Sequence, residues 1–197
     1  MKNTIWAAAL ITLLCASKSF AQDSIPSVEK SIKGVQIGLG AWINYEFKLG
    51  SQFSLRAEAG LNGSVFYQKS LYYGEDLGFV MSPVIKAEPR WYYNLEGRIK
   101  KGRNIKGNSG NFLSLPISYS PDWFLISSKG EEGINMRPQL SFIPTWGLRR
   151  TVGKHFDYEA GIGIGYAYAF EYKNNGYTYE ANNATVVNIH LRIGYHF

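Results

Sequence analysis

Polar and apolar residues alternate along the last thirteen residues of the chain. Within residues 185–197 every second position is apolar or aromatic, and polar residues such as Asn188, His190 and Arg192 lie between them. Successive side chains of a β-strand point to opposite faces, so a period of two predicts a strand with one apolar and one polar face. The chain therefore ends in such a strand, whose last residue, Phe197, is aromatic.

The same period recurs in six earlier segments. With the last one, the predicted strands are residues 35–47, 53–66, 79–93, 112–126, 136–149, 156–170 and 185–197. Aromatic residues collect near the ends of these segments, as they do where a sheet crosses the two interfaces of a bilayer. Prolines at positions 83, 89, 116, 138 and 144 lack the amide hydrogen that a ladder needs, so we also expect local bulges there.

This pattern predicts an all-β fold, namely an up-and-down antiparallel transmembrane β-barrel. A closed barrel satisfies its backbone hydrogen bonds internally and turns alternate side chains to lipid and to the lumen. Bacterial barrels of a single chain have even strand numbers, so we expect eight strands. The missing strand lies in residues 22–33, or one of the longer segments contains two strands. A soluble lipocalin-like barrel is the alternative, but its apolar face would point inward.

The N-terminus resembles a secretory signal peptide. Lys2 precedes an apolar stretch over residues 5–16, and the small residues Ser19 and Ala21 predict cleavage after Ala21. The stretch is shorter than the roughly 20 residues that span a bilayer. We therefore divide the chain into a cleaved signal peptide (1–21), an N-terminal segment that is a candidate first strand (22–34) and an outer-membrane β-barrel (35–197). An anchor acylated at Cys15 is an alternative, which the bulky preceding Leu14 disfavours.

Ten charged side chains fall on the predicted inner face, five acids and five bases. They are Glu46, Arg56, Glu58, Lys86, Glu88, Arg90, Arg149, Asp157, Glu159 and Arg192. The interior of an eight-stranded barrel is just wide enough for side chains, and an unpaired charge there costs several kcal/mol. We therefore expect ion pairs to plug the periplasmic half of the lumen.

Small residues occupy the inner face of the other half, among them Gly161, Gly163 and Gly165. They predict either a vestibule or strands that coil tightly at glycine. We favour the vestibule, filled in part by an aromatic loop that contains Tyr67, Tyr72 and Tyr73.

The formal net charge of +6 reflects one local cluster of bases. Arg98, Lys100, Lys101, Arg103 and Lys106 lie together in the long connection 94–111, which we place in the periplasm, with a short helix starting near Asn94. This segment contacts lipid headgroups or a periplasmic protein partner, or is a solvated linker. A local cluster does not indicate nucleic-acid binding, which needs a basic face with aromatic platforms.

Catalytic and metal-binding patterns do not emerge from the sequence. A deacylase would need a serine beside a histidine and an acid, and no serine is obviously placed beside His155, His190 or His196. We therefore predict no enzyme activity, metal or cofactor, and a binding, scaffold or envelope-maintenance role in the outer membrane. Outer-membrane lipid and the barrel-assembly machinery are the expected partners. A narrow porin-like channel and a lipid-modifying enzyme are the alternatives.

Several motifs resemble those of a known group of proteins. They are residues 88–95 (EPRWYYNL) with the basic stretch that follows, residues 108–112 (NSGNF), residues 161–166 (GIGIGY) and residues 191–197 (LRIGYHF). Together they resemble small outer-membrane β-barrel proteins of the Bacteroidetes type. This resemblance spans most of the chain after the signal peptide and implies a barrel, without assigning catalytic residues.

Overall fold

The chain folds as an antiparallel sheet that closes on itself. The computed structural model describes residues 26–70, 74–128, 137–174 and 177–197. Its strands are β1 (Ser31–Gly38), β2 (Gly40–Lys48), β3 (Phe53–Ser70), β4 (Gly74–Trp91), β5 (Gly110–Ser114), β6 (Ile117–Ser120), β7 (Ile126–Ser127), β8 (Gln139–Phe142), β9 (Thr145–Val152), β10 (Phe156–Ala169), β11 (Tyr172–Asn174), β12 (Tyr177–Tyr179) and β13 (Asn182–His196). Two short helices, α2 (Leu95–Lys100) and the 3₁₀ helix η1 (Lys106–Asn108), lie between β4 and β5.

Pairing of the first and last strands closes the ring. Val35 of β1 lies opposite Ile43 of β2 on one side and opposite Tyr195 of β13 on the other. Strands β5, β6 and β7 follow one another along β4, and β8 and β9 follow one another along β10, so each series occupies one position. The ring therefore has eight strand positions, which confirms the predicted all-β antiparallel fold and its strand number.

The predicted single strand over residues 35–47 is wrong. It is a hairpin, in which β1 and β2 are joined at Leu39, with Ile37 opposite Ala41 and Gly38 opposite Gly40. The first strand begins at Ser31, so the boundary that we drew between residues 34 and 35 falls inside it. Gly40 has a φ of +136°, and a Cβ atom there would overlap the Leu61 carbonyl oxygen, so the turn requires glycine.

Two of the five prolines that we expected to cause bulges interrupt strands. Pro116 separates β5 from β6, and Pro144 separates β8 from β9. The strands stay connected across these breaks, because the Ile143 amide donates to the Pro116 carbonyl (3.1 Å) and the Leu115 amide to the Pro89 carbonyl (3.2 Å). In β4, by contrast, Pro83 and Pro89 keep their register with β3. At Pro116 and Pro144, where local bulges were expected, the structure thus has interruptions between two strands.

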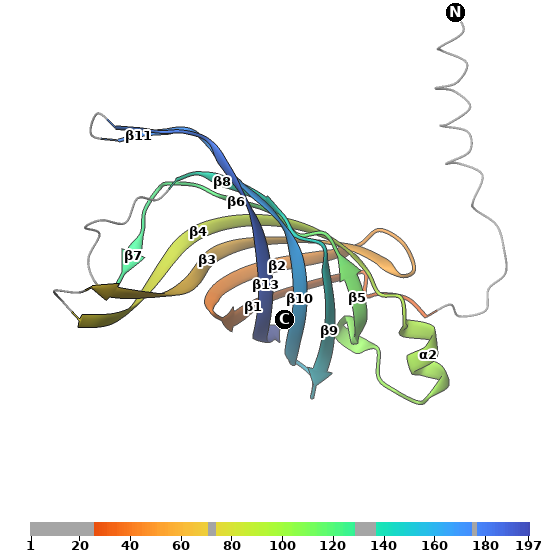
Figure 1. Ribbon diagram of the computed structural model, residues 1–197. Coiled ribbons are helices and arrows are strands. Elements are labelled where there is room, and N and C mark those ends of the chain that lie inside the picture. Colours follow the sequence, from red (N-terminus) through yellow and green to blue (C-terminus); the bar gives the residue numbers. More distant parts are fainter. Residues whose placement is uncertain (1–25, 71–73, 129–136, 175–176) are drawn as a thin grey trace, which may run out of the picture.

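The ring has two different ends (Figure 1). One end, here called the capped end, carries α2, the short turns after β2 and β9, and the C-terminus. The other, the hairpin end, carries the tip of the β3–β4 hairpin, β7 and the β11–β12 hairpin. In the described part of the chain, no helix has the length and apolar character needed to cross a membrane.

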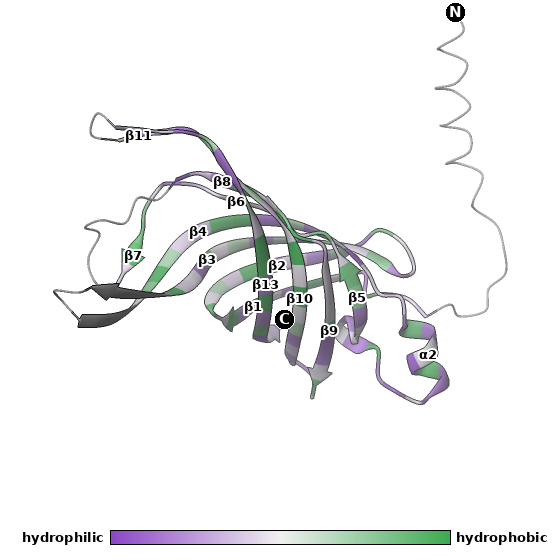
Figure 2. Ribbon diagram, viewed as in Figure 1, coloured by the Kyte–Doolittle hydropathy of each residue, from purple (hydrophilic) through white to green (hydrophobic). Residues whose placement is uncertain are grey.

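Burial is inverted relative to that of a water-soluble protein. Hydrophobic and hydrophilic residues alternate along the strands (Figure 2), and the apolar ones point outward. Ile43, Ile189 and Leu191 are 64%, 71% and 69% exposed, whereas most of the buried residues are polar or charged. The outward apolar face predicted from the period of two is therefore confirmed, and the inward apolar face of a lipocalin-like barrel is not observed.

Aromatic side chains line the outer face near the capped end. Phe53 stacks on Trp91 at 6.1 Å between ring centroids, and Phe156 packs edge-on against Tyr195 at 5.3 Å. The Trp146 indole donates a hydrogen bond to the Tyr93 hydroxyl (2.8 Å). These contacts join rings from neighbouring strands into a band around this end of the ring.

Candidate functional site

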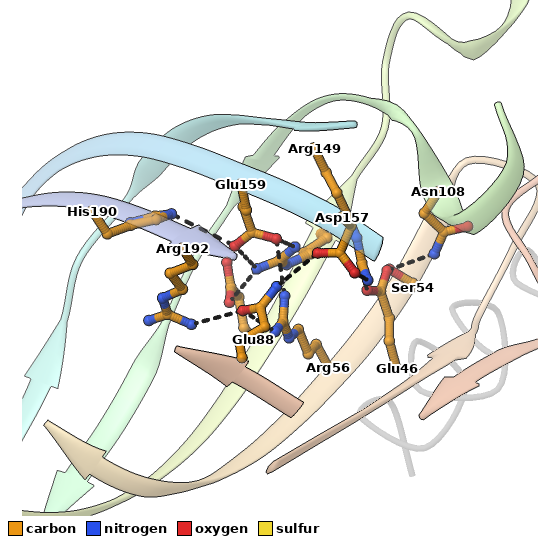
Figure 3. Close-up of polar contacts among 12 residues, drawn as sticks. Glu46, Ser54, Arg56, Glu88, Asn108, Arg149, Asp157, Glu159, His190 and Arg192 are labelled. Carbon is orange, nitrogen blue, oxygen red and sulfur yellow. Dashed lines mark hydrogen bonds and ion pairs between the residues drawn. The ribbon is translucent and has the colours of Figure 1, made fainter. Parts of the chain in front are cut away.

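The candidate site is a network of ion pairs inside the ring (Figure 3). The structure brings together all ten charged residues of the predicted inner face, and each is at most 8% exposed. They come from β2 (Glu46), β3 (Arg56, Glu58), β4 (Lys86, Glu88, Arg90), β9 (Arg149), β10 (Asp157, Glu159) and β13 (Arg192). Alternation along each strand places them inward, and the closed ring makes their side chains converge.

The middle of the network is formed by two arginines and two glutamates. Glu159 accepts from Arg56 Nη1 (3.0 Å) and from Arg90 Nη1 (2.7 Å). Arg90 also binds Glu88 (2.9 Å), and its guanidinium lies 4.3 Å from the centre of the Phe112 ring. Each charge here has an opposite partner, so this part of the network is neutral.

Toward the capped end, one arginine is shared by two acids. Arg149 donates from Nη1 to Glu46 (3.0 Å) and from Nη2 to Asp157 (2.9 Å). Glu46 accepts further hydrogen bonds from Ser54 Oγ (2.6 Å) and Asn108 Nδ2 (2.7 Å). Glu46 shares Arg149 with Asp157, and the uncharged donors Ser54 and Asn108 complete the hydrogen bonding of its carboxylate.

At the opposite side of the network, one acid is shared by three bases. Glu58 accepts from Arg56 Nη2 (2.7 Å), Lys86 Nζ (3.0 Å) and Arg192 Nη1 (2.9 Å). Arg192 also lies over the Trp42 ring, with its guanidinium carbon 4.1 Å from the ring centre. The favourable face of an indole supports a cation that has no carboxylate of its own.

The network is therefore neutral in total but polarised from end to end. Glu58, Lys86 and Arg192 together carry a formal charge of +1, and Arg149, Glu46 and Asp157 together carry −1. The remaining four residues balance one another. Alternation predicted which residues face inward, but it could not predict this arrangement.

Besides Ser54, three further buried residues of the network were not among the ten. Gln36 accepts from Arg56 (2.6 Å) and donates to Asp157 (3.1 Å), so it joins two otherwise separate pairs. Tyr92 and Asn108 both donate to Glu46. The inner-face positions of Gln36, Ser54 and Tyr92 were visible in the sequence, because each falls on the even-numbered inner face of a predicted strand (35–47, 53–66 and 79–93). Asn108 lies in a connection, where no periodicity marks a side chain as inward.

Residues 92–109 form a cap over one end of the ring. Tyr92, Leu95 and Phe112 are fully buried and pack with Val28, while Asn108 reaches from η1 to Glu46. The expected short helix near Asn94 is confirmed as α2. Burial raises the pKa of the Tyr92 phenol, so its hydroxyl stays protonated and donates to Glu46 (3.0 Å).

The five residues of the basic segment do not join the network. Arg98 is half-buried and donates from Nη2 to the Asn104 carbonyl (2.8 Å), whereas Lys100, Lys101, Arg103 and Lys106 are exposed. Lys100 pairs with Glu96 one turn earlier (2.6 Å), which raises the pKa of Lys100 and lowers that of Glu96. The segment is thus a solvent-facing surface of the cap.

A cavity of about 340 Å³ lies on the hairpin side of the network. Its lining includes Trp42, Asn62, Lys86, Ser118, Gln139, Asn188, His190 and Arg192. The glycines of β10 do not create this space, because a Cβ at Gly161 would meet the His190 ring and one at Gly165 the Phe142 carbonyl oxygen. Neighbouring side chains and backbone occupy the space beside these glycines, while the alternative, strands that coil tightly at glycine, stays a prediction. The side chains of Tyr67, Tyr72 and Tyr73 lie outside the described residues.

Among the residues that the structure describes, no group of three or more His, Cys, Asp or Glu side chains is arranged to hold a metal ion. Comparisons with protein-family models, with curated proteins and with solved structures find no match.

Proposed function

We propose that the protein is an integral outer-membrane β-barrel whose lumen is plugged by ion pairs, and that its role is in binding, scaffolding or maintenance of the envelope. The observation that carries this proposal is the inverted burial, in which aliphatic side chains cover the outer face while charges fill the interior. Soluble monomers rarely expose contiguous apolar patches of more than a few hundred Å². Lipid is the solvent in which such a surface is stable.

Backbone hydrogen bonding supports the same proposal. A segment in the bilayer core must satisfy its amide and carbonyl groups within the protein, which only helices and closed sheets achieve. Here β1 pairs with β13, so the ring presents no free edge between the first and last strands. The aromatic band near the capped end, with Trp91, Trp146 and Tyr195, has the amphipathic side chains that favour a membrane interface.

We further propose that the capped end faces the periplasm. Short turns follow β2 and β9 at this end, whereas the long hairpins lie at the other, as in outer-membrane barrels. The basic segment then faces the periplasm, where lipid headgroups or a periplasmic protein are its candidate partners. The motif resemblance to small Bacteroidetes outer-membrane barrels supports an outer-membrane location.

A plugged lumen is favoured over a narrow porin by the ion pairs and by the cap. Arg56, Arg90 and Glu159 meet in the interior from three strands, and residues 92–109 close one end. In planar bilayers we expect the purified protein to give no stable channel steps. Stable open-channel currents would contradict the plug and leave the membrane barrel intact.

Migration in gels tests the membrane barrel itself. Protein extracted from envelopes with mild detergent should migrate at one position without boiling and at another after boiling, because closed barrels resist unfolding by detergent. It should also stay with the membrane fraction after a carbonate wash. Recovery of the folded protein from aqueous extract without detergent would overturn the proposal.

A further inference from the structure

The cavity next to the network is lined by basic and polar side chains, as a binding site for a small molecule would be. Two cationic residues, Lys86 and Arg192, line the cavity, and His190 lies beside them in the lining. None of the described residues that line the cavity is an aspartate or a glutamate. Its volume of about 340 Å³ lies at the lower end of the range for small-molecule sites, which is roughly 300–1,000 Å³.

Both cations are largely buried and are only partly neutralised. Lys86 and Arg192 share Glu58 with Arg56, and their side chains are 9% and 7% exposed. Trp42, itself 5% exposed, supports the Arg192 guanidinium from one side and donates its indole hydrogen to Asn62 (3.0 Å). The positive side of the polarised network therefore forms part of the cavity wall.

Arg192 retains hydrogen-bonding capacity. Its hydrogen bonds to Glu58 and Gln36 leave from Nη1, and its Nη2 has no hydrogen-bond partner among the described residues. A guanidinium has five donors, and a buried donor without a partner costs free energy. An anionic acceptor in the cavity would supply both the missing charge and the missing acceptor.

We infer that this cavity binds a small polar molecule that carries one anionic group, a carboxylate, sulfate or phosphate, with Lys86 and Arg192 as its ligands. The amide and hydroxyl groups of Asn62, Ser118, Gln139 and Asn188 also line the cavity and suit the polar remainder of such a molecule. This inference deepens the proposed binding role and rests on the same closed ring, but it does not depend on the orientation in the membrane.

Calorimetric titration of the detergent-solubilised protein tests the inference. The probes are sodium sulfate, inorganic phosphate and glucuronate, with glucose as the uncharged counterpart of glucuronate. We expect the anions to bind, glucose not to bind, and added salt to weaken binding. Binding of sulfate or phosphate alone identifies a free inorganic anion as the ligand, and binding of glucuronate identifies an organic acid. Equal binding of glucose, or no binding of any anion, would overturn the inference.

Variants locate the site. Lys86→Gln and Arg192→Gln each leave Glu58 with two bases, and each should weaken anion binding by roughly ten- to a hundredfold, the usual effect of one charge-assisted hydrogen bond. The matched control is Lys101→Gln in the exposed basic segment, which should bind like the parent protein. A loss of binding in the control but not in the cavity variants would place the anion on the cap and contradict the inference.

A further variant avoids the ion pairs altogether. Asn188→Asp adds a carboxylate to the cavity lining without removing a partner of Glu58, so it should abolish anion binding while the ring stays folded. The boiling-dependent gel shift of each variant reports folding separately. Absence of binding in a parent protein that shows the shift would refute this inference alone, whereas absence of the shift would count against the proposed barrel.

Discussion

At the scale of single residues, the acids of the network are not equivalent. Glu58 compensates three buried cations, whereas Glu88 pairs with one base among the described residues, Arg90, which has a second partner in Glu159. Removing one partner of a buried ion pair is strongly destabilising, because it leaves an uncompensated charge in a medium of low polarity. We therefore expect that replacing an acid lowers the free energy of unfolding more when that acid pairs with more bases.

The substitution Glu58→Gln tests this difference. It leaves Arg56, Lys86 and Arg192 around a neutral amide, and we expect a loss of about 3–5 kcal/mol in the free energy of unfolding. Glu88→Gln is the matched control and should cost clearly less, since Arg90 keeps Glu159. Urea unfolding in lipid vesicles measures both values. Equal losses would show that the sharing of Glu58 has no energetic consequence.

Asn108 joins the cap to the network. Its Nδ2 donates to Glu46 (2.7 Å), its Oδ1 accepts from the Glu29 amide (2.7 Å), and its backbone has a φ of +58°, which asparagine tolerates better than most residues. Asn108→Ala should therefore destabilise the protein by about 1–3 kcal/mol and make residues 92–109 sensitive to protease.

The exposed Asn104 provides the control for this variant. Its side chain accepts one hydrogen bond, from the Lys106 amide (2.8 Å), at the surface of the cap. Asn104→Ala should change stability by less than about 0.5 kcal/mol. If limited proteolysis cuts both variants alike, Asn108 does not hold the cap in place.

The orientation of these residues could be predicted from the sequence, but their partners could not. Inward-facing residues follow from the period of two, which holds as long as a residue lies in a strand. Partner choice depends on which strands meet across the interior, as when Arg56 of β3 reaches Glu159 of β10. Asn108 was missed because η1 belongs to an irregular connection and carries no such pattern.

At the scale of elements, the β1–β2 turn shows why two strands were mistaken for one. Residues directly opposite in an antiparallel pair share a face. Because Ile37 lies opposite Ala41, odd-numbered residues point outward on both sides of Leu39, and the alternation continues through the turn unchanged. The period of two therefore carries no mark of this turn. Its signal is Gly40, whose positive φ only the structure reveals.

The turn supplies a prediction for this element. Gly40→Ala places a methyl group against the Leu61 carbonyl and the Trp42 ring at a left-handed φ, so we expect a loss of about 1–3 kcal/mol and less folded protein. Gly50→Ala, at the other end of β2, meets only Phe53 at ordinary contact distance (3.7 Å) and should fold normally. The fraction that shows the boiling-dependent gel shift measures the difference. Equal fractions would mean that the turn tolerates a side chain.

At the scale of the whole molecule, the distribution of polarity is the property on which the proposed function depends. The alternating sequence predicted both faces of the sheet, and the closed ring decides which face is inside. Apolar residues such as Ile162 and Ile189 are 53% and 71% exposed, and they lie opposite one another on adjacent strands. In water this surface would be unfavourable, whereas in a bilayer it faces lipid tails.

The most direct test of this account compares two neighbouring positions on β13. Cys15 is the only cysteine, so a Cys15→Ala chain accepts single cysteines at Ile189, which points outward, or at Asn188, which lines the cavity. Each is labelled with a small fluorophore, and the protein is reconstituted in vesicles whose lipid tails carry bromine. We expect strong quenching at Ile189→Cys and little at Asn188→Cys. Equal quenching at both positions, or none at Ile189→Cys, would contradict it.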